Sequence, residues 1–437
     1  MRCCSSPRKI WAVPDLFHDW NGAGCPGELG SAVVLDETLR DGIQSPSAID
    51  PPIEAKIALL HLLDELGVYQ LDLGLPGAGP HQRADVKRLA EEKRDAKLRI
   101  RINVACRTVV SDIQPAAELQ QETSVPLEVY AFIGSSPVRQ YAEEWDLAFI
   151  EKQSVEAISF AVGQGLAVTY VTEDTTRSKP EDLERLFRSA IDAGAKRLCL
   201  CDTVGHATPE GAAALVKFAR GIAGPEIGLD WHGHNDRGLA LANALAAGAA
   251  GATRLHGCAA GIGERVGNTA SDQLLVNLKL FGHPVYGPRD MSQLSRFVEL
   301  AARATGHTLP VNYPVVGGDA FRTATGVHAA AIIKAQRKGD RWLADRVYSG
   351  VPAGEFGKEQ QIEIGPMSGL SNVKHWLARH EIPADEPLAR AVLQRAKASD
   401  RTLTESEVAQ IVRQEERALP ASPVAERQSA EKPKGRS

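Results

Sequence analysis

The sequence has no apolar run that approaches the roughly 20 residues needed to span a bilayer. Its first twenty residues include basic side chains but lack the apolar segment of a secretory signal. The net charge of -5 gives no reason to expect a nucleic acid or an anionic membrane as a partner. We therefore expect a cytoplasmic protein with neither kind of partner.

Cysteine is scarce, with seven residues scattered through a chain of 437. Cys106, Cys199 and Cys201 lie in strand-like runs and Cys258 follows one, which indicates buried free thiols in a reducing compartment. Cys199 and Cys201 have the i, i+2 spacing of a metal-binding pair, but no second cysteine pair faces them. A thiolate metal site is therefore not expected.

A GxGxxG motif is also missing after the first apolar run, which argues against a doubly wound dinucleotide-binding sheet. Instead, apolar strand-like runs alternate with helical segments, several of which open with proline and close with glycine. Eight such runs begin at Ser31, Tyr69, Lys97, Leu127, Leu166, Lys196, Gly228 and Arg254. Eight strands alternating with helices over roughly 250 residues predict an α/β fold of the (β/α)8 TIM-barrel class.

The pattern changes after about Gly287, where the regular alternation of strands and helices stops. We expect four parts: an N-terminal extension over 1–30, the catalytic barrel over 31–287, mainly helical accessory subdomains over 288–383, and a segment over 384–437 that is helical and then disordered. The last part of this segment is rich in Lys, Glu and Ser, a composition that does not build a core.

Three residues at predicted strand ends have the chemistry of a metal site. Asp41 follows the first strand, and His232 and His234 stand two residues apart at the end of another. Two His at i and i+2 on a strand project to the same side, so both imidazoles can face one ion. One carboxylate and two imidazoles suit a borderline divalent metal with open positions for substrate oxygens. Asn268 is either a further ligand through its amide oxygen or a helix cap.

Other polar residues at strand ends have two interpretations each. Arg40 is either a guanidinium that stabilises charge in the transition state or part of a salt bridge in the barrel mouth. Thr203 either hydrogen-bonds a substrate carboxylate or forms a turn. Glu173, a catalytic candidate, stands next to Asp174 and near Arg177, with which it could form an ion-pair network.

Five segments together resemble one known family. They are LDETLRDGIQSP, EDTTR, DTVGHATP, HGHNDRGLALANALAAGA and GCAAGIGERVGN, and they occur in this order at suitable spacings. They are similar to those of the 2-isopropylmalate synthase and homocitrate synthase family, the metal-dependent, Claisen-condensing branch of the TIM-barrel metallolyases. The resemblance covers roughly residues 31–378.

The resemblance implies an acyltransferase of carboxylic and amino-acid metabolism, including leucine biosynthesis. Such an enzyme condenses acetyl-CoA with a 2-oxo acid, hydrolyses the thioester and releases CoA. It implies a divalent metal, Mn, Mg or Zn, held by Asp41, His232 and His234, with Asn268 at a further position of the metal site. Arg40 matches the arginine that stabilises the oxyanion. The residues implied to bind substrate are Gln44, Thr203 and Arg139.

The resemblance also implies a homodimer with shared active sites. His328 matches a histidine that acts as general base or its relay and is donated by the partner subunit, and Tyr348 matches a tyrosine of the same subdomain. A histidine near its ordinary pKa is a reasonable proton acceptor. The alternative is that both residues only pack within a linker.

The identity of the 2-oxo acid is left open by departures from the family pattern. Ile43 replaces a polar residue before Gln44, and Arg139 stands where isopropylmalate synthases carry histidine. Arg139 either selects an anionic 2-oxo acid or is a solvated arginine. The main expectation is a 2-isopropylmalate synthase-like enzyme. The alternatives are a homocitrate or citramalate type of synthase and a carbon–carbon lyase similar to HMG-CoA lyase.

Overall fold

The structure is a computed structural model that describes residues 16, 20–23 and 29–418. The chain divides into two compact units, 1–289 with 300–307 and 290–299 with 308–437. Helix α10 (Leu294–Ala304) contributes residues to both units. The predicted disorder of the tail concerns residues 421–437, which lie outside the described residues. No helix in the described part of the chain is long and apolar enough to cross a membrane.

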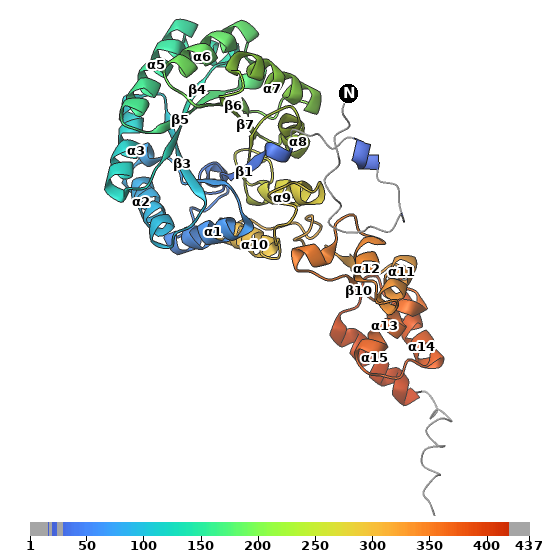
Figure 1. Ribbon diagram of the computed structural model, residues 1–437. Helices are drawn as coiled ribbons and strands as arrows, with labels where there is room; N and C mark the ends of the chain where they lie inside the picture. Colours follow the sequence, from blue (N-terminus) through green and yellow to red (C-terminus); the bar gives the residue numbers. More distant parts are fainter. Residues whose placement is uncertain (1–15, 17–19, 24–28, 419–437) are drawn as a thin grey trace, which may run out of the picture. The chain divides into compact units, whose positions relative to one another are not determined.

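The first unit is built on a closed barrel of eight parallel strands, ordered β1 to β8, with β8 pairing back onto β1 (Figure 1). The strands are β1 Val33–Asp36, β2 Gln70–Asp72, β3 Arg101–Arg107, β4 Glu128–Gly134, β5 Ala167–Glu173, β6 Arg197–Asp202, β7 Gly228–Gly233 and β8 Arg254–Gly257. Most strand residues are buried, as expected for a parallel sheet covered by helices on its outer face. The predicted TIM-barrel class is confirmed.

Helices surround the strands and follow them in the order of the chain (Figure 1). They are α1 Ile53–Leu66, α2 Pro80–Asp95, α3 Val110–Thr123, α4 Pro137–Glu143, α5 Leu147–Gly163, α6 Pro180–Asp192, α7 Pro209–Ala223, α8 Ala240–Ala249 and α9 Ser271–Leu280. Single 3-10 turns are η1 Trp20–Ala23, η2 Leu29–Ser31, η3 Gly42–Gln44, η4 Pro76–Ala78, η5 Thr175–Arg177 and η6 Ala259–Gly261.

Local sequence determines where these helices begin and end. Helix α7 starts with Pro209, and the side chain of Thr208 accepts a hydrogen bond from the backbone N–H of Gly211. Helix α1 ends at Gly67, whose φ of +76° lies in the left-handed region that favours glycine. The cap at Thr208 fixes the end of a loop that leaves the carboxyl edge of the barrel, whereas Gly67 begins a loop that returns to the opposite edge.

A buried polar network fills part of the barrel interior. The Tyr130 hydroxyl donates to Asp230 Oδ2 at 2.7 Å, and Arg254 lies 2.9 Å from both carboxylate oxygens of Glu128. His256 Nε2 is 3.2 Å from Asp230 Oδ2. Buried charges are tolerated when they are paired in this way. Because Tyr130 and His256 also line the pocket described below, the network reaches the candidate site.

The second unit combines a two-stranded parallel sheet with short helices. Its elements are β9 Arg322–Thr323, α11 Gly326–Arg337, α12 Arg341–Arg346, η7 Ala353–Phe356, β10 Gln361–Ile362, α13 Leu370–Arg379, α14 Glu386–Lys397 and α15 Glu405–Ala418. One hydrophobic cluster includes Val373 and Trp376 of α13, Val392 of α14 and Val412 of α15. These three helices therefore share a core. Helix α13 lies before the domain boundary expected at residue 383 and α14 and α15 lie after it, so the core spans that boundary.

Candidate active site

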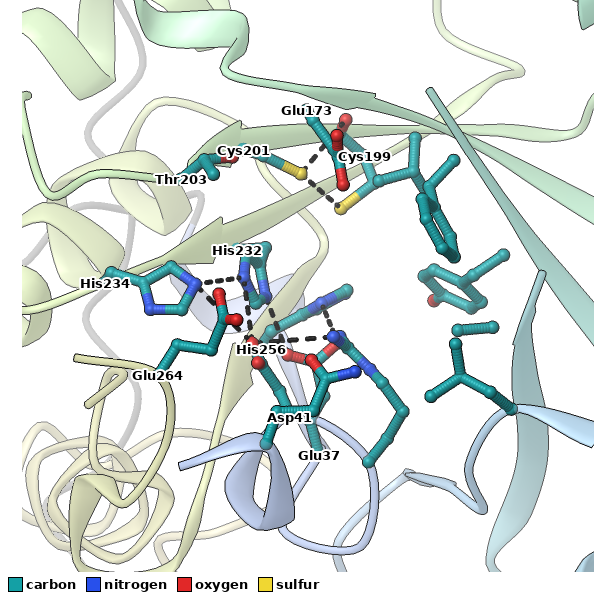
Figure 2. Close-up of a pocket in the computed structure, with 17 residues that line it drawn as sticks. Glu37, Asp41, Glu173, Cys199, Cys201, Thr203, His232, His234, His256 and Glu264 are labelled. Carbon is teal, nitrogen blue, oxygen red and sulfur yellow. Dashed lines mark hydrogen bonds and ion pairs between the residues drawn. The ribbon is translucent and has the colours of Figure 1, made fainter. Parts of the chain in front are cut away.

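A pocket of about 270 Å³ lies at the carboxyl ends of the barrel strands, and Figure 2 shows the side chains that line it. All of its lining residues belong to the first unit. Arg40, Asp41 and Gln44 come from the loop after β1, and Glu173 and Thr203 from the ends of β5 and β6. This is the face of a (β/α)8 barrel on which active sites are built.

Asp41, His232 and His234 meet on one side of this pocket. Asp41 Oδ2 lies 3.3 Å from His232 Nε2 and 3.6 Å from His234 Nε2, and the two Nε2 atoms are 3.2 Å apart. All three side chains are buried, and their ligand atoms lie close enough together to hold one ion. Both histidine side chains therefore lie on the same side, as their spacing in the sequence predicts.

Asn268 adjoins this group and carries an unused acceptor. Its Nδ2 donates to Asp41 Oδ2 at 2.8 Å and to Cys258 Sγ at 3.2 Å. Its Oδ1 is buried and has no hydrogen-bonding partner among the described residues. A Cβ at Gly263 would lie only 2.7 Å from this oxygen, so glycine leaves the space beside it open. A buried amide oxygen without a partner, on a residue that contacts Asp41, fits a further ligand of a divalent cation.

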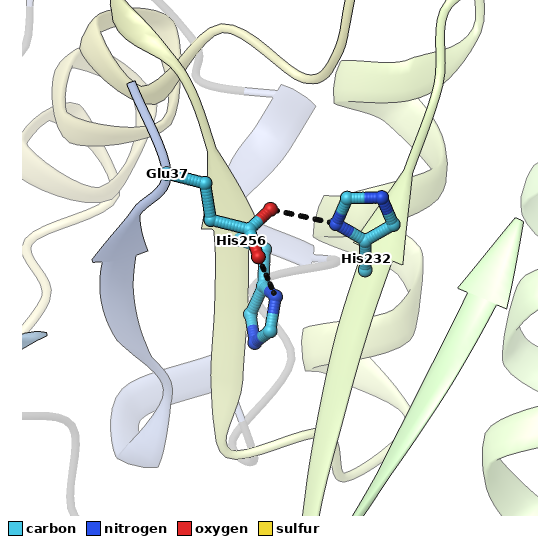
Figure 3. Close-up of side chains that lie close together, drawn as sticks. All are labelled: Glu37, His232 and His256. Atoms are coloured by element: carbon cyan, nitrogen blue, oxygen red, sulfur yellow. Dashed lines mark hydrogen bonds and ion pairs between the residues drawn. The ribbon is translucent and has the colours of Figure 1, made fainter. Parts of the chain in front are cut away.

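Glu37 connects two histidines and an arginine, a role that no pattern in the sequence indicates. Its Oε2 lies 2.7 Å from His232 Nδ1 and its Oε1 lies 3.1 Å from His256 Nδ1 (Figure 3). Arg40 donates to Oε1 at 2.5 Å. Because Glu37 accepts the Nδ1 proton of His232, the Nε2 atom is left facing Asp41 and His234, where a metal ion can displace any proton that it carries. Glu37 is thus saturated by donors and orients a candidate ligand.

The two candidate histidine ligands have opposite pKa shifts. Burial opposes charge on His232, but the carboxylate of Glu37 outweighs it and raises the pKa of His232 to about 10. Burial, together with the neighbouring His232, lowers the pKa of His234 to about 4. The arrangement thus favours positive charge beside Glu37 and Asp41 while one imidazole stays neutral. The same two carboxylates would stabilise a divalent cation.

Arg40 lies between three carboxylates at the edge of the pocket. Its guanidinium is 3.2 Å from Asp72, 3.5 Å from Asp41 and 2.5 Å from Glu37. Despite burial, these charges raise the pKa of Arg40 well above its usual range. Burial raises the pKa of Asp72 to about 7 even though Arg40 opposes the shift. Arg40 therefore forms the salt bridges of one interpretation and also lines the pocket, while its role in the transition state stays a prediction.

The remaining barrel candidates differ in their relation to the pocket. Gln44, Thr203 and Glu173 line it, and burial raises the pKa of Glu173. The Thr203 hydroxyl oxygen accepts a hydrogen bond from the backbone N–H of Asp174 at 2.9 Å. Arg139 is not one of the lining residues. It is half-exposed and lies 3.1 Å from Glu143 and 3.9 Å from Glu173.

His328 and Tyr348 both belong to the second unit, and the structure brings them together. His328 lies on α11 and Tyr348 follows α12, and their rings stack with centroids 4.0 Å apart. Tyr348 is half-exposed, so the pair is not sealed within a core. The motif match that paired these two residues is therefore supported by proximity, while their role stays a prediction.

Several pocket residues were not anticipated, among them Phe132, Val171, Cys199, Cys201 and His256. Each lies on a strand, where alternate residues point into the barrel. That alternation is readable in the sequence, but which of the two alternating sets faces inward follows from the register of the neighbouring strands.

Comparison with known proteins now places the chain in a family. The HMGL-like family model matches residues 32–300, more than half of the sequence. The chain belongs to the HMGL-like family. Among the similar proteins, homocitrate synthase AksA of Methanopyrus kandleri is 33% identical over 87% of this chain and 91% of its own length. The 2-isopropylmalate synthase of Sulfolobus acidocaldarius is 31% identical over 83% of this chain and 89% of its own length.

Solved structures agree with the barrel of this HMGL-like chain. The HMG-CoA lyase of Brucella melitensis superposes with a TM-score of 0.52 at 21% identity, covering 62% of this chain and 98% of that one. At this identity the likeness shows the fold alone. The resemblance to the condensing synthases, which the motifs indicated, is confirmed by relatives that match most of the chain.

Proposed function

We propose that this HMGL-like protein is an acyltransferase that condenses acetyl-CoA with a 2-oxo acid, hydrolyses the thioester and releases CoA. The observation that carries the proposal is the convergence of Asp41, His232 and His234 beside Arg40 in the barrel mouth. The relatives named as synthases match over four-fifths of the chain, which is more than the barrel unit alone contains. The lyase matches about three-fifths of it and shows the fold alone.

A divalent metal is part of the proposal. Asp41, His232 and His234 would hold it, with Asn268 Oδ1 as a further ligand. When bound, it supplies a Lewis acid that binds and polarises the 2-oxo acid. One carboxylate, two imidazoles and an amide oxygen suit Mn, Mg or Zn.

The protein's own residues supply the rest of the chemistry. Arg40, fixed by Asp72 and Glu37, holds positive charge where an enolate or alkoxide oxygen develops in the pocket. Glu173, whose pKa is raised by burial, lines the pocket and would exchange a proton with the substrate. In a homodimer with shared sites, His328 of one protomer accepts a proton from the acetyl methyl group in its partner's barrel, and Tyr348 positions His328 by stacking.

The pocket wall favours a 2-oxo acid with an apolar side chain. Leu75, Ala105, Phe132 and Val171 are apolar residues among those that line the pocket. A hydrophobic wall contributes roughly 1–3 kcal/mol of discrimination per methylene. This supports a 2-isopropylmalate type of reaction over a homocitrate type. Selection of an anionic acid by Arg139 is the alternative, and it requires the guanidinium to leave Glu143.

The test is thiol release from acetyl-CoA, with Mn or Mg present, across a panel of 2-oxo acids. We expect release with a branched apolar acid, and His232→Ala should abolish it. A matched control is His81→Ala, because His81 belongs to another carboxylate–histidine group, with Asp50 and Asp85, on the outside of the barrel. This variant should keep full activity.

A dicarboxylic acid as the best substrate would support Arg139 as the selector. Absence of release with every acid would refute the condensing function, and cleavage of hydroxyacyl-CoA thioesters would then test the lyase alternative. The proposal places the enzyme in the cytoplasm, where acetyl-CoA is available, and cell fractionation checks that location.

A further inference from the structure

Cys199 and Cys201 form a close pair of thiols in the wall of the pocket. Both lie on β6, both are free and buried, and both line the cavity. Their sulfur atoms are 3.9 Å apart, as Figure 2 shows on the side of the pocket opposite Asp41. Because they are two residues apart on one strand, their side chains point to the same face.

The spacing of the two sulfurs suits a bridging atom better than a disulfide. Residues i and i+2 of a strand have Cα atoms about 6.6 Å apart, near the upper limit for disulfides, so a direct bond would require β6 to bend. An ion with bonds to sulfur of about 2.3 Å holds two thiolates between about 3.3 Å apart, for pyramidal angles near 90°, and about 3.8 Å apart, for tetrahedral angles. The observed 3.9 Å lies just above this range, so rotation of the two side chains can close the gap while the strand stays unchanged.

The surroundings leave these thiols available. Leu35, Tyr130 and Val171 pack around them in one hydrophobic cluster, with Phe132 at its edge. Within the described residues, the nearest hydrogen-bonding partner of each sulfur is the sulfur of the other cysteine, at 3.9 Å. Hard cations prefer oxygen ligands and borderline cations also accept imidazole, and both kinds of ligand are found at Asp41 and the two histidines. A thiophilic ion prefers the sulfur pair instead.

We propose that Cys199 and Cys201 form a dithiol site in the pocket wall that binds one trivalent arsenic atom or a comparable thiophilic ion. With arsenous acid, two As–O bonds break and two As–S bonds form. The two thiol protons leave in two molecules of water, and no atom changes oxidation state. The site needs only two sulfurs, so the lack of a second cysteine pair in the sequence does not exclude it. A bound atom occupies space that the pocket otherwise offers to substrate.

The test uses the full chain with Cys3 and Cys4 replaced by serine, because these adjacent residues are another possible dithiol. The protein is incubated with arsenite, or with phenylarsine oxide as a second probe, and its intact mass is measured. We expect one arsenic per chain. Cys199→Ser and Cys201→Ser should each abolish the adduct. Cys106→Ser is the matched control and should retain it, since Cys106 is a buried, free cysteine of β3.

A second measurement does not depend on the folding of the variants. In the folded chain with only Cys3 and Cys4 replaced, arsenite should protect Cys199 and Cys201 together from alkylation, and a competing small dithiol should remove the protection. An adduct that persists in both serine variants, or full alkylation of both thiols in the presence of arsenite, overturns the proposal. Neither readout requires turnover, so failure here is distinct from failure of the proposed condensing reaction.

Discussion

Replacement of Glu37 by glutamine tests whether this carboxylate orients the candidate metal ligand. In the protein, Glu37 Oε2 accepts the Nδ1 proton of His232 at 2.7 Å, while Oε1 faces His256 and Arg40. A glutamine can offer its oxygen to the latter pair only by turning its NH2 group toward His232. That amide favours the tautomer with the proton on Nε2, which removes the lone pair needed for a metal.

The expected cost follows from this geometry. Loss of the partner of a metal-binding histidine typically lowers metal affinity 10- to 100-fold, or about 1.4–2.7 kcal/mol. The buried carboxylate also attracts a divalent cation more strongly than the single proton that the cation displaces at His232, so its loss adds to the effect. Arg40 keeps its contacts with Asp72 and Asp41, which limits damage elsewhere. We expect the Kd for Mn²⁺ to rise about 30-fold.

The assay is titration of metal-free protein with Mn²⁺, in which free Mn²⁺ is followed by its paramagnetic resonance signal. The matched control is Glu92→Gln, which breaks another glutamate–histidine contact, the 2.9 Å pair with His61 on the outer helices. Glu92→Gln should leave the Kd unchanged. If Glu37→Gln binds Mn²⁺ within twofold of the unaltered protein while remaining folded, the orienting role of Glu37 is wrong.

Three further outcomes are expected. Arg40→Lys should lower kcat by about 10²-fold, because the lysine ammonium is a single point charge whereas the guanidinium presents several donors in a fixed plane. Steady-state kinetics at saturating metal check this. Burial raises the pKa of Asp36 from 3.8 to about 6, so the folded state binds this proton more tightly and the free energy of unfolding falls as pH rises from about 4 to 6. Asp36→Asn should remove up to about 3 kcal/mol of this dependence in denaturant titrations, and an unchanged slope would contradict it. Mixing the inactive variants His328→Ala and Asp41→Asn should restore about a quarter of full activity if subunits exchange and share sites, whereas no recovery after verified exchange opposes sharing.

The barrel and its metal-binding group could be predicted because both depend on short-range periodicity. The spacing of His232 and His234 fixes their common side, and the parallel topology brings Asp41 to the same edge. Glu37 could not be placed in this way. Its contact with His256 depends on the register of β1 with β8, in which Asp36 pairs with Gly257, and no local pattern sets that register.

Other parts of the candidate site depend on side-chain and inter-chain geometry. Arg139 has the residue type expected for an anion selector, yet its guanidinium is placed beside Glu143, an interaction that follows from the turn of helix α4. His328 and Tyr348 were paired by motif, and their stacking supports the pairing. Their action in a partner's barrel stays a prediction, because it depends on a surface formed by two chains.

Because β1 pairs with β8, a metal bound at this site would link the two ends of the barrel sheet. Glu37 and His232 lie 195 residues apart in sequence, and the ligand set joins the first strand to the last two. A chain that lacks β7 and β8 cannot form the set, so metal binding reports that the last strands have docked. An ion that binds only the closed barrel adds about 2.7 kcal/mol at a concentration of 100 Kd. The cation that serves catalysis would therefore also hold the first strand of the barrel to the last two.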